Sequence, residues 1–257
     1  MDTWKDNIFF VLVEPKEPGN IGASARAIKN MGFRNLCLVS PPAQMSDEGR
    51  WFARNSHDVL DSAMIFSSVA DAVKDKSLIV GTTRTAGKRR GLILPAAEGA
   101  SKVCTMAANN TVAILFGREA RGLLRKEIDE CGFMLTIPSS TVQPSLNLSH
   151  AVLIIAYELF LADPGSSDAA RAAGSYIVQP EAGVSPPLLR HRESAGLYER
   201  ISEALELLDY IPRGDENMKK KIMVDLRHFI GRAGLTDAEF TMLKGICCQI
   251  EKKIRRR

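Results

Sequence analysis

The chain reads Ile8-Phe9-Phe10-Val11-Leu12-Val13 and then, after five residues, Gly19-Asn20-Ile21-Gly22-Ala23-Ser24-Ala25-Arg26. The first stretch is apolar and rich in β-branched and aromatic residues, which predicts a buried strand, and the second opens a helix-like segment. Further strand-like runs, separated by helix-like segments, lie at Leu36–Val39, Leu78–Val80, Val112–Phe116 and Phe133–Ile137. This alternation predicts an α/β fold with a mainly parallel sheet.

Three helices of this domain have recognisable ends. Asn20 is placed to cap a helix that runs toward Met31, with Gly32 beyond it. A second helix is predicted over Leu123–Cys131, where Gly132 stops it. Ala151–Leu161 is almost entirely apolar and predicts a buried helix.

The chain of 257 residues divides into three parts. Residues 1–162 form the α/β domain, and residues 163–192 are rich in Pro, Gly, Ser and Ala and predict a linker. Residues 193–257 predict a small helical unit with helices at Tyr198–Leu208, Met218–Ile230 and Thr236–Arg257. Thr236 and Glu239 have the spacing of a capping box at the start of the last helix.

Composition excludes several classes of protein. Hydrophobic residues make up 45% and charged residues 25% of the chain, which is typical of a globular protein. The longest apolar run, Ala151–Ala162, is shorter than the ~20 residues of a membrane-spanning helix, and the N-terminus has no signal-peptide pattern. We therefore expect a cytoplasmic protein with no membrane partner. The five cysteines have no paired metal-ligand spacing, so we expect mostly buried thiols and no metal site.

The segment Gly19–Arg26 lies where many α/β proteins bind a cofactor, but its spacing does not fit a dinucleotide. It lacks the G-x-G-x-x-G pattern, and the second strand ends at Val39-Ser40-Pro41-Pro42 without an acidic residue to bind a ribose. No triphosphate-binding loop occurs in the chain. Either the segment is a close-packed turn with an exposed Arg26, or Arg26 and the helix N-terminus bind a phosphate.

Two further segments follow predicted strands. Phe116-Gly117-Arg118-Glu119-Ala120-Arg121-Gly122-Leu123 comes at the carboxyl end of a strand, the edge where open α/β sheets bind ligands. It is either a ligand-binding loop or a glycine turn with solvated charges. Ile137-Pro138 is followed by Ser145-Leu146-Asn147-Leu148-Ser149-His150, in which Ser145 and Asn147 are helix caps or site residues. We assign His150 no role.

Together the patterns N-x-G-x-x-x-R, F-G-R-E-x-x-G-L and I-P-x(6)-S-L-N-L, in this order, resemble the SPOUT superfamily of RNA methyltransferases and its TrmH-like group. Phe10–Pro15, Gly81–Arg84 and Leu243–Ile246 are similar to a branch that methylates a tRNA ribose 2′-oxygen at nucleotide 32 of the anticodon loop.

The resemblance implies a C-terminal trefoil knot, formed by about Phe133–Ala162, that binds S-adenosylmethionine. The family's cofactor residues fall on Thr82, Thr83, Arg84, Gly117, Ile137, Ser145, Leu146 and Asn147. It also implies a homodimer that pairs through the helix near Leu148–Leu161, with RNA lying across both subunits.

The resemblance assigns the catalytic set to Arg26, Asn20 and Ser145. Because a guanidinium is a poor base, we interpret Arg26 as a clamp that orients a phosphate and stabilises the developing alkoxide. Since only RNA has a 2′-hydroxyl, the partner is tRNA and not DNA. The basic residues expected to contact it are Arg84, Lys88, Arg89, Arg90, Arg118 and Arg121. The helical unit carries two more basic runs, Lys219–Lys221 and Lys252–Arg257, so we expect an RNA-binding tail.

Two alternatives stay open at this stage. One is a ribosomal RNA 2′-O-methyltransferase of the same group. The other is an RNA-binding adaptor that keeps the fold without turnover. It is disfavoured because the chain has the family's Asn20, Arg26, Glu119, Ser145 and Asn147.

Overall fold

The computed structural model describes residues 4–42, 47–84, 91–163, 185–212 and 214–255. The strands are β1 (Ile8–Val13), β2 (Asn35–Val39), β3 (Met64–Phe66), β4 (Leu78–Thr83), β5 (Leu92–Pro95), β6 (Val112–Phe116) and β7 (Phe133–Thr136). The helices are η1 (Trp4–Asn7), α1 (Pro18–Asn30), α2 (Asp47–Ala53), η2 (Arg54–Ser56), α3 (His57–Asp61), α4 (Val69–Val73), α5 (Ala96–Ala107), α6 (Arg125–Ile128), α7 (Leu148–Leu161), α9 (His191–Leu207), α10 (Glu216–Gly231) and α11 (Asp237–Arg255).

All strand pairs are parallel, and the sheet order is β3-β2-β1-β6-β4-β7-β5. The prediction of a mainly parallel α/β domain is therefore confirmed. Strand β4 lies between β6 and β7, so the carboxyl ends of these three strands meet at one edge of the sheet. That edge is where the two later segments of interest begin.

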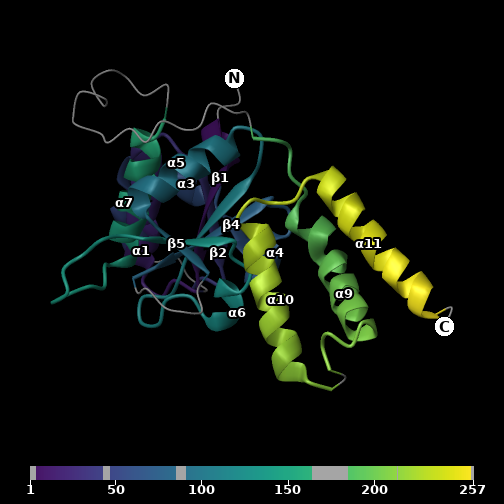
Figure 1. Cartoon of the computed structure of the whole chain (residues 1–257). Coiled ribbons are helices and arrows are strands. Elements are labelled where there is room, and N and C mark those ends of the chain that lie inside the picture. The colour runs from purple at the N-terminus through teal and green to yellow at the C-terminus, as the bar shows by residue number, and fades with distance from the viewer. Residues whose placement is uncertain (1–3, 43–46, 85–90, 164–184, 213, 256–257) are drawn as a thin grey trace.

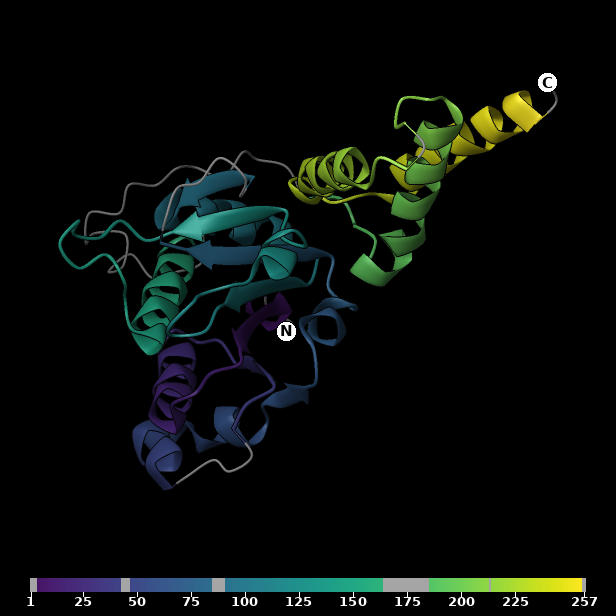
Figure 2. The same cartoon turned by 90° about the horizontal axis from the view of Figure 1, so that it is seen from below.

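Helices cover both faces of the sheet (Figures 1 and 2). Side chains of β1 and β6 alternate between the faces, as the period of a strand requires. Phe10 and Ile114 pack with α1, α5 and α7 on one face, whereas Val11 and Leu115 pack with α4 and α6 on the other. Because β1 and β6 are buried on both sides, their sequences are apolar without alternation.

Helix α1 begins earlier than Asn20, which corrects the predicted cap. Pro18 is its first residue and Glu17 stands at the cap position without a side-chain cap bond. A proline favours the first helical turn because its φ is already helical and the missing N–H needs no partner there. Asn20 thus lies inside the first turn, and its side chain is available for other contacts.

Short elements account for the other differences. Strands β3 and β5 have three and four residues and lie at the two edges of the sheet, so they lack a long apolar run. The helix predicted over Leu123–Cys131 is limited to Arg125–Ile128. Helix α7 includes the predicted Ala151–Leu161 and begins at Leu148, where Asn147 is the cap and its Oδ1 accepts from the Ser149 N–H at 2.9 Å.

The C-terminal helices form a unit in which α9 packs against both α10 and α11 (Figure 1). The predicted capping box is confirmed, since Glu239 accepts from the Thr236 N–H at 2.9 Å and Thr236 Oγ1 accepts from the Glu239 N–H at 3.3 Å. Helix α9 starts at His191, inside the predicted linker, because the Glu193 carboxylate accepts from the Arg190 N–H at 2.7 Å. Among the described helices, none has the length and apolar character needed to cross a bilayer.

The segment that enters α9 is bonded to the α/β domain. The His191 and Arg192 N–H groups donate to the carbonyls of Lys76 and Lys74 at 2.8 and 3.0 Å. In addition, Glu130 pairs with His191 at 3.1 Å and with Arg227 of α10 at 2.9 Å. This docking fixes α9 and α10 against the domain, which differs from a freely tethered tail.

Candidate active site

A cavity of about 220 Å³ opens at the carboxyl ends of β4, β6 and β7. Most of the predicted cofactor residues line it, namely Thr82, Thr83, Arg84, Gly117, Ile137, Ser145 and Leu146. Leu135 and Leu148 add apolar walls, and the loop 117–123 supplies one side. Residues far apart in the sequence therefore meet in one place, because parallel strands deliver their following loops to the same edge.

A chain of polar contacts links the three segments beside this cavity. The Glu119 carboxylate accepts from the N–H groups of Lys16 and Glu17 at 3.3 and 3.5 Å and from Asn20 Nδ2 at 3.1 Å. Asn20 Oδ1 in turn accepts from Asn147 Nδ2 at 2.9 Å. Since Asn147 also caps α7, the loop after β6 and the N-termini of α1 and α7 are held together. Asn147 does not line the cavity itself, but its chain neighbours Leu146 and Leu148 do.

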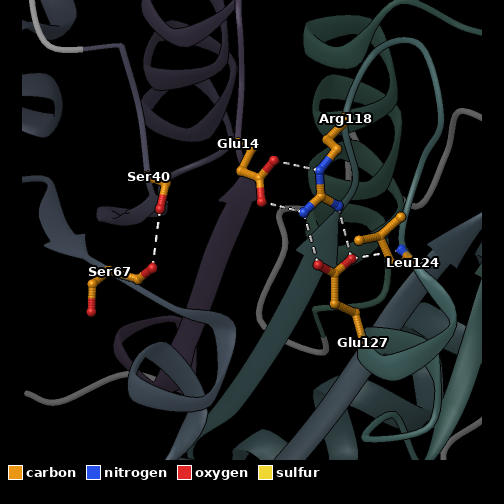
Figure 3. Close-up of polar contacts among 6 residues, drawn as sticks. All are labelled: Glu14, Ser40, Ser67, Arg118, Leu124 and Glu127. Atoms are coloured by element: carbon orange, nitrogen blue, oxygen red, sulfur yellow. Dashed lines mark hydrogen bonds and ion pairs between the residues drawn. The ribbon is translucent and has the colours of Figure 1, made fainter.

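Arg118 is held between two carboxylates (Figure 3). Its Nε donates to Glu14 Oε2 at 2.7 Å, and its Nη atoms donate to the two oxygens of Glu127 at 3.0 and 2.9 Å. A further bond joins Nη2 to Glu14 Oε1. The hydrogen bond with Arg118 holds the pKa of the Glu14 carboxyl below its ordinary value.

The predicted RNA contact at Arg118 is therefore wrong for this geometry. Its side chain is only 9% exposed and its guanidinium is occupied by the two carboxylates. Glu14 adopts a left-handed conformation with φ of 47° at the end of β1, and its bonds to Arg118 offset the backbone strain of that conformation. Arg118 acts as a positioning residue that ties β1 and α6 to the loop after β6.

The loop 117–123 is folded tightly on itself. A Cβ at Gly117 would lie 2.1 Å from the carbonyl carbon of Gly122, and Gly122 has φ of +65°. Gly117 is thus required by the approach of its own loop, and any side chain there would open the loop that forms the cavity wall.

The remaining predicted site residues lie at the cavity, elsewhere on the domain, or outside the described residues. Arg84 and Arg121 line the cavity and are exposed at its rim. Thr82 Oγ1 donates to the Leu115 carbonyl at 2.9 Å and so joins β4 to β6. Arg26 is exposed on α1, does not line the cavity and makes no hydrogen bond or ion pair with a described residue. Lys88, Arg89 and Arg90 lie outside the described residues.

Sequence reasoning missed Glu14 and Glu127, and it counted Glu119 among the family's residues without assigning it a partner. Glu119 is the one carboxylate among the described residues that line the cavity, and it positions Asn20 rather than standing free. A signal for Glu14 was present, since it follows a buried strand directly and ends the run Ile8–Val13 with a charge. No sequence signal marked Glu127, because its contact with Arg118 depends on the tertiary fold.

Residues 7–157 match the model of the SpoU rRNA Methylase family. The chain belongs to the SpoU rRNA methylase family. Family membership confirms the methyltransferase resemblance seen in the three segments, and the match covers the whole α/β sheet and most of α7.

Relatives of this SpoU-family chain extend over its full length. It is 33% identical over 247 residues to a "tRNA (cytidine/uridine-2'-O-)-methyltransferase TrmJ" of Escherichia coli K12, covering 96% of both chains. It is 30% identical over 253 residues to an "Uncharacterized tRNA/rRNA methyltransferase" of Haemophilus influenzae, covering 97% of this chain and 96% of that one. The C-terminal helices are thus included in the likeness.

A solved structure of TrmJ from Z. mobilis ZM4 superposes with a TM-score of 0.74 at 24% identity, covering 95% of this chain and 98% of that one. A probable methylase family protein from Haemophilus influenzae gives 0.59 at 29% identity, with 98% of each chain covered. These matches show that the fold of this SpoU-family chain, helical unit included, is shared with solved proteins.

Proposed function

We propose that this chain is an S-adenosylmethionine-dependent methyltransferase that acts on a ribose 2′-oxygen of tRNA, at nucleotide 32 of the anticodon loop. One observation carries the proposal: the three segments typical of the family line or brace a single cavity at the carboxyl edge of the sheet. The name of the E. coli relative supports the tRNA ribose as target. The proposal includes the trefoil knot over Phe133–Ala162 and a cytoplasmic site of action.

The cavity suits S-adenosylmethionine better than a nucleotide carrying phosphates. Apolar side chains of Leu135, Ile137 and Leu148 offer a surface for the adenine ring, and the folded loop at Gly117 brings backbone groups close. Thr83, Ser145 and Leu146 complete the lining. When bound, S-adenosylmethionine supplies a methyl group on a sulfonium, which the ribose 2′-oxygen attacks as the carbon–sulfur bond breaks.

The residues of the chain orient the RNA and stabilise charge. Asn20 and Asn147 fix the α1 N-terminus against the cavity through Glu119, and Ser145 stands on the cavity wall. The exposed Arg84 and Arg121 are placed to contact phosphates at the rim. Lys88, Arg89 and Arg90, which lie outside the described residues, are proposed as RNA contacts from the sequence alone. Arg26 acts as the clamp that stabilises the negative charge developing on the 2′-oxygen.

The position of Arg26 favours a homodimer. Arg26 forms no ion pair with a described residue and does not line the cavity of its own chain, so we propose that it serves the cavity of a partner. Helix α7 presents Leu153 and Tyr157, 38% and 44% exposed, four residues apart on one face. Burying these side chains against a second copy would remove apolar surface from water, and we propose this face as the dimer interface.

The C-terminal unit, residues 193–257, is proposed to bind RNA and not the methyl donor. None of its described residues lines the cavity, and its basic residues have phosphate-binding chemistry. Residues 163–192 connect it to the methyltransferase domain.

Labelled S-adenosylmethionine and total RNA test the function. We expect label in the tRNA fraction, in dinucleotides that resist alkali, because a methylated 2′-oxygen cannot attack the neighbouring phosphodiester. Label in the ribosomal fraction alone would support the rRNA alternative. RNA binding without any label would overturn the enzyme and support the adaptor.

A further inference from the structure

A second cavity, a groove of about 1210 Å³, lies between α10 and the α/β domain. Helix α10 contributes Lys220, Lys221 and His228, and Arg232 directly follows it. Helix α6 contributes Arg125, and Gly91 directly precedes β5. None of these residues lines the cofactor cavity. The groove is therefore a separate site, formed only because the C-terminal unit is docked.

The groove has an excess of unpaired positive charge. Arg125 is paired with Asp129 at 2.8 Å, but Lys220, Lys221 and Arg232 form no ion pair with any described carboxylate. The other acidic side chain of the groove is Asp225. Lys219, the neighbour of these lysines, differs because it pairs with Glu206 at 2.7 Å. These three cations form no ion pair within the described residues that could stabilise the fold, and even paired surface charges contribute little to stability. The fold therefore does not explain why they are gathered here.

His228 is a second and independent sign of a ligand. Its side chain lines the groove, the residue is only 7% exposed, and its Nε2 has no hydrogen-bond partner among the described residues. The ring is packed against Gly91, where a Cβ would lie 3.0 Å from Nδ1. A buried polar atom without a partner is costly, and a bound acceptor would remove that cost.

The surroundings of Arg232 agree with an anion. Lys102 of α5 has a lowered pKa, first because it is buried and then because the positive charge of Arg232 is near. Lys102 does not line the groove itself, but an anion bound by Arg232 would offset the positive charge that Lys102 faces.

The groove and the cofactor cavity have no lining residue in common, but one short segment connects them along the chain. Leu123 lines the cavity and Arg125, two residues later, lines the groove. The loop after β6 therefore contributes to the cavity, and the helix α6 that follows it contributes to the groove.

We propose that the groove between α10 and the α/β domain binds a backbone phosphate of the RNA substrate through Lys220, Lys221, His228 and Arg232. The inference rests on the proposed function, because it takes the RNA bound at the cavity as the ligand. It assigns the docked helical unit a role in substrate binding at a defined place.

The test compares full-length Lys220→Gln and Arg232→Gln with Lys219→Gln. All three remove one positive charge from α10 or the residue that follows it, but only the first two remove it from the groove. Lys220 and Arg232 are exposed, so the variants should fold, and thermal unfolding checks this. Affinity for labelled tRNA is measured by anisotropy over a range of salt concentrations.

We expect each groove variant to weaken tRNA binding roughly tenfold, the effect of one lost charge-assisted hydrogen bond, while Lys219→Gln stays near wild type. The log-log salt slope should fall by about 0.7 to 0.9 for each lost phosphate contact. Affinity and slope unchanged in both groove variants, with tRNA methylation by the wild type intact, would overturn the groove and leave the function standing.

Inorganic phosphate separates RNA from a free anion. If phosphate shifts the His228 ring signals in NMR spectra and the groove variants abolish that shift without changing tRNA affinity, the site binds a free anion and the RNA proposal is overturned. Absence of methyl transfer by the wild type would instead contradict the proposed function.

Discussion

At the residue scale, one buried arginine organises the loop beside the cavity. Arg118 and Glu127 are 9% and 4% exposed in their side chains, and Glu127 also accepts from the Leu124 N–H at 2.6 Å. A buried pair of this kind contributes little net stability compared with apolar residues, but the loss of one partner leaves the other charged and unpaired. The arrangement therefore fixes geometry more than it adds stability.

Arg118→Ala is expected to lower the free energy of unfolding by about 3 to 5 kcal/mol, because Glu127 would stay buried without its cation. The exposed Arg121→Ala on the same loop should change it by less than about 0.5 kcal/mol. Urea unfolding of both variants measures the difference. Equal stability of the two would show that the Arg118 network has no structural role.

At the element scale, the central strands were predictable and the contacts between elements were not. Ile8–Val13 and Val112–Phe116 were predicted with the bounds that the structure has, because both are buried on two faces and wholly apolar. The edge strand Met64–Phe66 carries no such signal, because an apolar run of three residues is too short to predict a strand.

Some site residues could also be located from the local sequence, whereas the contacts between them could not. The sequence placed Gly117 and Ser145 at strand ends, and both line the cavity. The bond from Asn147 to Asn20 spans 127 positions and depends on the order of the strands, which no local pattern determines. The role of Asn20 as a cap was wrong because Pro18 starts the helix two residues earlier.

The docking of α10 depends on a close approach of two backbones. A Cβ at Gly231 would lie 2.7 Å from the Gly132 Cα, whereas a Cβ at Gly245 in α11 would meet nothing within 4 Å. Gly231→Ala should therefore destabilise the docked helices, while Gly245→Ala should stabilise α11 by about 0.5 to 1 kcal/mol. Hydrogen exchange of α9 and α10 reports the first effect and thermal unfolding the second. A Gly231→Ala protein with unchanged exchange in α10 would argue against this contact.

Docking is also expected to weaken in acid. The hydrogen bond with His191, assisted by the charge of Arg227, lowers the pKa of Glu130 from its ordinary 4.5. Glu130 therefore stabilises the folded state above pH 4.5, and this contribution is lost as the pH falls through the lowered folded value.

Urea unfolding between pH 6 and pH 3.5 should show this loss in the wild type and a flatter profile in Glu130→Gln. Glu199→Gln, on an exposed part of α9 without a described ion pair, is the control and should keep the wild-type profile. If Glu130→Gln follows the same pH profile as the wild type, the carboxylate does not couple docking to pH.

At the scale of the whole molecule, the proposed dimer forms each active site from the cavity of one chain and Arg26 of the other. Arg26→Ala should keep its cavity but lose methyl transfer, and Ile137→Trp should fill the cavity but keep Arg26. If Arg26 serves the partner, each mixed dimer has one active site, formed by the intact cavity of one variant and the Arg26 of the other. Random exchange makes about half of the dimers mixed, so the mixture should have about a quarter of the wild-type activity. Methyl transfer by the mixture measures this. A mixture as inactive as its components would place Arg26 in its own chain's site.

The most direct measurement uses two tRNA transcripts that differ by one oxygen atom. One has ribose throughout, and the other has 2′-deoxyribose at nucleotide 32. With labelled S-adenosylmethionine, the account predicts one methyl group on the first transcript and none on the second, although both bind equally, because the deoxy nucleotide has no nucleophile. Equal labelling of the two transcripts would put the methyl group on another atom and contradict the account.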